Sequence, residues 1–81
     1  MNCFVLKELH LPASLYMMGE KAIYGCAGLK NIYCQAAEPA SIHADTFESI
    51  RFNVCRLHVP QGSTEKYKQD KHWKPFSLIE E

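Results

Sequence analysis

The segment CFVLKELHL at residues 3–11 recurs at residues 26–34 as CAGLKNIYC, 23 positions further along the chain. Five aligned positions carry identical or similar residues: Cys3 and Cys26, Leu6 and Leu29, Lys7 and Lys30, Leu9 and Ile32, and Leu11 and Cys34. Self-similarity at a fixed interval is typical of repeat proteins, in which each unit buries its apolar face against its neighbours. The repeat therefore predicts a stack of similar units rather than a conventional closed core.

Further copies support this interpretation. Residues 57–60, LHVP, repeat LHLP at residues 9–12 after 48 positions, which is two intervals of 24. Residues 42–47 align with residues 18–23 at an interval of 24, and a last candidate unit is FSLI at residues 76–79. The sequence thus predicts two to three units, with the pattern C-x-x-L-x-x-L-x-φ (φ being apolar or cysteine) as their core.

A short strand is expected in each unit, because apolar residues alternate at Leu9 and Leu11, at Ile32 and Cys34, and at Leu57 and Val59. The residues between them, His10, Tyr33 and His58, fall on one repeat position and should form an outward-facing row. Two interpretations of this row stay open. It is either a solvated sheet face without a partner, which is the simpler interpretation, or part of a binding face.

Residues 61–81 depart from the repeat and predict a cap over the last unit, because an uncovered end would leave an exposed edge. Ser63 is a candidate N-cap for a short helix from about residue 64 to 70 that places Tyr67 inward. Trp73 and Phe76 should cover the open core, and residues 78–79 should add a final strand. These aromatic residues are candidates for a ligand platform, but a capping cluster is favoured because large aromatic side chains dominate burial.

Charge and hydropathy exclude several classes of protein. Nine basic and nine acidic residues give a net charge of +0, which lacks the basic surplus typical of nucleic-acid binding or of attraction to an anionic membrane. No apolar run approaches the roughly 20 residues that span a bilayer, and no signal peptide is expected within this segment. The basic cluster is expected to be a solvated surface; it consists of Lys66, Lys68, Lys71, His72 and Lys74.

Four cysteines raise three further hypotheses. A zinc site would need Cys55 and His58 together with Cys34 or His43, but the chain has no C-x-x-C pair and its spacing matches no common zinc motif. A Cys3–Cys26 disulfide is compatible with strand spacing, although free thiols in a buried ladder are favoured. A catalytic cysteine–histidine pair is the enzyme hypothesis, and nothing specifies which cysteine would be activated.

The repeats resemble the BspA-like branch of bacterial leucine-rich repeats. The resemblance rests on LPASL at residues 11–15, MGEKAIYGC at residues 18–26 and Leu29, and it extends through LHVPQGSTEKY at residues 57–67 and WKPF at residues 73–76. Ile23 stands where that family usually has Phe, and Met18 where it usually has Ile. The resemblance implies a secreted or cell-surface protein of host-associated bacteria that acts in adhesion or protein binding. It implies no catalytic residues.

The expected architecture is a single leucine-rich-repeat domain over residues 1–81, with repeats at 1–60 and a C-terminal cap at 61–81. Its fold class is mostly β with little helix (α+β), a right-handed solenoid of two to three coils. The expected function is non-catalytic binding of a protein or another extracellular macromolecule, without cofactor or metal. The alternative is a purely structural cap of a longer array, whose exposed N-terminal coil would allow homodimer formation.

Overall fold

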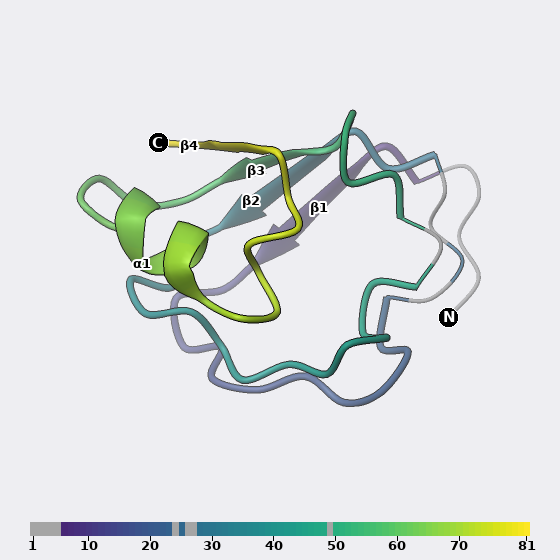
Figure 1. Cartoon of the computed structure of the whole chain (residues 1–81), viewed down its shortest axis with the longest axis horizontal. Helices are drawn as coiled ribbons and strands as arrows, with labels where there is room; N and C mark the ends of the chain where they lie inside the picture. Colours follow the sequence, from purple (N-terminus) through teal and green to yellow (C-terminus); the bar gives the residue numbers. More distant parts are fainter. Residues whose placement is uncertain (1–5, 24, 26–27, 49) are drawn as a thin grey trace.

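The chain folds around a four-stranded parallel sheet (Figure 1), in a computed structural model that describes residues 6–23, 25, 28–48 and 50–81. The strands are β1 (Glu8–Leu11), β2 (Asn31–Cys34), β3 (Arg56–His58) and β4 (Leu78–Glu80), and they lie side by side in chain order. One six-residue helix, α1 (Thr64–Gln69), lies between β3 and β4. Within the described ranges, no helix is long and apolar enough to cross a membrane.

The strand register brings the repeat positions together. Leu9 pairs with Ile32, Ile32 with Leu57, and Leu57 with Ile79, so these four residues form one row across the sheet. Ile32 and Leu57 are completely buried, whereas Leu9 on the edge strand is only partly buried. In-register parallel pairing keeps apolar side chains on the inner face and the alternate residues on the outer face.

The long connections β1–β2 and β2–β3 also run beside each other beneath the sheet (Figure 1). The backbone amides of Met18, Ile23 and Gly25 donate to carbonyls of Ser41, Thr46 and Glu48, at 2.9, 2.9 and 3.2 Å. The aligned segments 18–23 and 42–47 are therefore joined laterally, although they contain no regular strand. Cys3 and Cys26, on which the predicted cysteine ladder and disulfide depend, lie outside the described residues.

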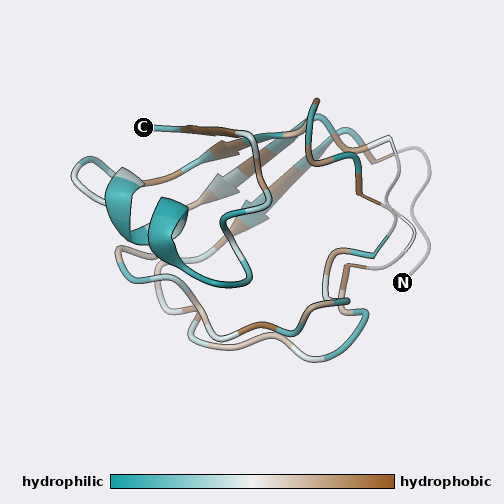
Figure 2. Cartoon of the chain, viewed as in Figure 1, coloured by the Kyte–Doolittle hydropathy of each residue, from teal (hydrophilic) through white to brown (hydrophobic). Residues whose placement is uncertain are grey.

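Residues after β3 contribute the largest buried side chains to the core. Tyr67 and Trp73 are completely buried, and Phe76 is nearly so. The rings of Phe47, Tyr67 and Phe76 surround Trp73 at centroid distances of 5.1–5.9 Å. Most residues of α1 are hydrophilic (Figure 2). The expected short helix and final strand are present, and the expected inward placement of the aromatic residues is confirmed.

The side-chain cap expected from Ser63 does not form. Ser63 precedes α1, but its hydroxyl makes no capping hydrogen bond and instead donates to the carbonyl of Ala37 at 2.9 Å. Ser63 is buried, so the hydroxyl needs a partner, and a carbonyl of the β2–β3 connection supplies it. The serine therefore ties the start of the helix to the loop beneath it.

Candidate binding face

Three stacked rings cross the outer face of the sheet. The rings of His10 on β1 and Tyr33 on β2 stack at a centroid distance of 4.7 Å, and those of Tyr33 and His58 on β3 at 4.5 Å. The interplanar angles are only 15° and 10°. Neighbouring strands are about 4.7–4.9 Å apart, so in-register pairing alone sets the rings at stacking distance. We call the set His10, Tyr33 and His58 the aromatic row.

Polar neighbours hold the His58 end of the aromatic row in place. The Nε2 of His58 lies 3.0 Å from Oδ1 of Asn31 on β2, and its Nδ1 lies 3.5 Å from Oε1 of Glu80 on β4. Because an amide oxygen only accepts hydrogen bonds, Nε2 is the donor in the contact with Asn31. Glu80 also faces Arg56 at 3.6 Å. These contacts restrict the rotation of the His58 ring and place charged and polar groups at this end of the aromatic row.

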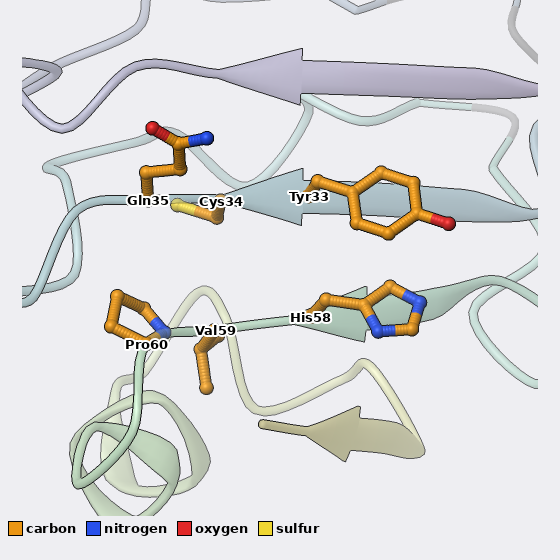
Figure 3. A pocket seen from close by; sticks show the side chains of 6 residues that line it. All are labelled: Tyr33, Cys34, Gln35, His58, Val59 and Pro60. Carbon is orange, nitrogen blue, oxygen red and sulfur yellow. The ribbon is translucent and has the colours of Figure 1, made fainter.

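A shallow cavity of about 300 Å³ opens beside the row, between the ends of β2 and β3. Figure 3 shows the side chains of Tyr33 and His58 projecting from the two strands with their rings side by side. The other lining residues are Cys34, Gln35, Val59 and Pro60. The two rings and Pro60 offer apolar contact area, and the exposed side-chain amide of Gln35 adds a polar group. The centres of protein interfaces combine such groups.

The two described cysteines face the core, although Cys34 also lines the cavity beside the aromatic row. Both are free and buried. The hydroxyl of Tyr67 donates to the carbonyl of Ala36 at 2.7 Å, so its single proton is used there, and the Cys34 thiol 3.0 Å away acts as donor to the tyrosine oxygen. Burial, followed by the contact with Cys34, raises the pKa of Tyr67 far above its ordinary value. This chain of hydrogen bonds joins β2, α1 and the β2–β3 connection within the core.

We expect Cys55 to resist alkylation in the folded chain. Burial raises its pKa from 9.0 to about 11, which makes the reactive thiolate roughly a hundredfold rarer at pH 8 than in an unfolded chain. Iodoacetamide labelling followed by mass spectrometry of the Cys55 peptide measures this directly. The thiol should react at least a hundredfold more slowly in buffer than in urea, and native labelling should accelerate as the pH rises towards 11. Equal rates in buffer and urea would show that the thiol is exposed.

The zinc hypothesis finds no geometric support in the described part of the chain. There, no group of three or more His, Cys, Asp or Glu side chains is placed to hold a metal ion. His58 lies on the outer face, stacked on Tyr33, whereas Cys55 is buried in the core. The two residues thus point to opposite sides of the sheet.

Several contacting residues were not identifiable from the repeat pattern. Asn31 and Glu80 orient His58, yet no motif marks them. Of the basic cluster expected to be solvated, Lys66 pairs with Glu38, and Lys71 and His72 line a pocket. The only available signal for Glu80 was its position one residue after the strand expected at 78–79; in the structure β4 includes Glu80 and pairs it with His58.

Comparisons of the chain with protein-family models, with curated proteins and with solved structures found no match. The function proposed below therefore rests on the repeat pattern and on the geometry of the outer face.

Proposed function

We propose that this chain is a non-catalytic protein-binding module of the leucine-rich-repeat type, and that the aromatic row is the centre of its binding face. In this proposal the parallel strands and their connections are coils of a solenoid, and residues 61–81 are its C-terminal cap. A bacterial cell-surface or secreted location, with a role in adhesion, follows from the resemblance to BspA-like repeats.

The observation that carries the proposal is the stack of His10, Tyr33 and His58 on an accessible sheet face. Energetically important interface residues are enriched in tyrosine and lie at the centre of a patch with a polar rim. Here Tyr33 lies at the centre of the row, and Asn31 and Glu80 lie at its edge. A rigid stack also loses little side-chain entropy when a partner binds.

Selection of a random peptide library displayed on phage, with the full chain immobilised, tests the proposal. Peptides enriched on the wild-type chain should bind the Tyr33→Ala variant at least about tenfold more weakly, because truncating a central aromatic anchor costs about 2 kcal/mol or more. The matched control is Tyr16→Ala. Tyr16 is also an accessible tyrosine, with 76% of its surface exposed, but it lies outside the aromatic row.

The outcomes separate clearly. Loss of binding on Tyr33→Ala with retention on Tyr16→Ala supports the aromatic row as the binding face. Equal binding to the wild-type chain and Tyr33→Ala, or no enrichment above an unrelated folded protein, contradicts it. Circular dichroism of both variants checks that each is folded before binding is compared.

A second candidate function is structural, and a different observation favours it. The β1–β2 connection leaves Tyr16 76% and Met17 55% exposed, and among the described strands β1 lies at the edge of the sheet with a partner on one side only. As the end of a longer array, or as one half of a homodimer, this edge would be covered by another coil. Light scattering at high concentration tests the homodimer: a dimer that Met17→Lys dissociates supports edge pairing, and a monomer counts against it.

A further inference from the structure

A second cavity lies apart from the aromatic row, where the β2–β3 connection meets the segment after α1. Its volume is about 290 Å³, near the lower end of the range for small-molecule sites. Its lining includes His43, Phe47, Phe52, Lys71, His72 and Pro75. None of the residues of the aromatic row lines it, so this cavity is separate from the proposed protein-binding face.

Aromatic side chains form a rigid apolar wall in this cavity. Phe47 is buried and meets the ring of Phe76 edge-on at 5.2 Å, and Phe52 meets the same ring at 4.8 Å. Because the ring of Phe76 packs against both Phe47 and Phe52, rotation of either ring would disturb this packing. The wall therefore offers a fixed apolar surface to the flat body of a ligand.

Three basic side chains surround this wall: His43, Lys71 and His72. None of them forms an ion pair with an acidic side chain in the described part of the chain, whereas Lys66 pairs with Glu38 and Arg56 with Glu80. Asp70, next to Lys71, is occupied by the backbone amides of residues 72 and 73, at 3.0 and 3.3 Å. The cavity thus combines an apolar wall with basic groups that have no acidic partner among the residues described.

Local hydrogen bonds fix the backbone that carries both histidines. The amide of His43 donates to Oγ1 of Thr46 at 2.8 Å, and the same hydroxyl donates to the carbonyl of Gly19 at 3.0 Å. Thr46 is completely buried, and its hydrogen bond to Gly19 joins this turn to the β1–β2 connection. The amide of His72 is held by Asp70 on the other side of the cavity. Binding a ligand here would require little ordering of the backbone.

We propose that this cavity binds a small aromatic monocarboxylate. The ring of the ligand packs on Phe47 and Phe52, and its carboxylate lies among Lys71, His43 and His72. An apolar wall selects the ring, and charge complementarity selects an acid over a neutral analogue of the same shape. A ligand of this size has few atoms to contact, so we expect a Kd in about the millimolar range.

Titration of the ¹⁵N-labelled full chain with benzoate, followed by NMR, tests the site. Benzoate should shift the amide signals of residues 43–47 and 71–75, and neutral benzamide should bind about tenfold more weakly. Because exposed charges are screened by salt, the benzoate affinity should fall when 0.5 M NaCl is added, while that of benzamide should not. Equal shifts by benzoate and benzamide, or shifts that map elsewhere, would overturn the proposal.

The matched pair Lys71→Gln and Lys68→Gln isolates the charge. Both lysines are exposed, but only Lys71 lines the cavity. We expect Lys71→Gln to weaken benzoate binding about threefold or more, as loss of one partly solvated charge contact implies, and Lys68→Gln to leave it unchanged. Identical affinities for the two variants would contradict the proposed role of Lys71.

Discussion

Replacing Trp73 with alanine is expected to remove about 3–5 kcal/mol from the free energy of unfolding, as for other large buried aromatic residues. Trp73 is completely buried, packs among three aromatic rings, and its indole Nε1 donates to the carbonyl of Ala40 at 2.8 Å. A domain of this length has a total stability of roughly 4–12 kcal/mol, so the substitution should remove a large part of it. Urea unfolding followed by far-UV circular dichroism measures the loss.

Two companion variants sharpen this test. Trp73→Phe keeps an aromatic ring, so it should cost less stability than Trp73→Ala. It should still be destabilising, because the Ala40 carbonyl loses its hydrogen-bond donor. Tyr16→Ala removes an aromatic ring that is 76% exposed, and it should change stability by no more than about 0.5 kcal/mol. If Trp73→Ala unfolded at the same urea concentration as the wild-type chain, residues 61–81 would not be packed on the core as described.

Replacing Leu57 with alanine is expected to cost about 2–5 kcal/mol. Leu57 is completely buried in β3, where it pairs with Ile32 on one side and Ile79 on the other. Interior strands leave little freedom to collapse around a lost side chain, so a cavity would remain. The fluorescence of Trp73, the only tryptophan, reports the urea unfolding curve of this variant.

The control for Leu57→Ala is Val54→Ala, three residues earlier. Val54 is 47% exposed, and its truncation should have little effect on stability. A cost for Leu57→Ala below about 0.5 kcal/mol would contradict the register in which Leu57 joins the inner row.

The sequence predicts the sheet well because the repeat carries register information. The 23-residue interval aligns Leu9 with Ile32, and the structure pairs these two residues. The later intervals vary, since Ile32 pairs with Leu57 and Leu57 with Ile79, at separations of 25 and 22 residues. Strand pairing tolerates such variation because the connecting loops, rather than the strands, absorb the extra residues.

Contacts between loops could not be predicted from the sequence. The hydroxyl of Ser63 was expected to cap a helix, but it reaches a carbonyl 26 residues earlier. Likewise, His43 and His72 line one cavity although they are 29 residues apart and no motif links them. Helical periodicity and strand alternation describe neighbours along an element, whereas these contacts depend on how irregular segments pack in three dimensions.

The aromatic row could be predicted in part. Its three residues share a repeat position, so alternation and the repeat interval predict that they lie on one face. The contacts of His58 with Asn31 and Glu80 depend on rotamers and on the register of β4, which the sequence does not specify.

The most direct test of the proposed binding face is an NMR footprint on the wild-type chain. A ¹³C-labelled sample is titrated with a peptide selected on that chain, and the ring signals of His10, Tyr33 and His58 are followed together with those of Tyr16. We expect the three stacked rings to shift together in proportion to occupancy while the Tyr16 ring does not. A footprint that moves Tyr16 and leaves the three rings unchanged would contradict the account.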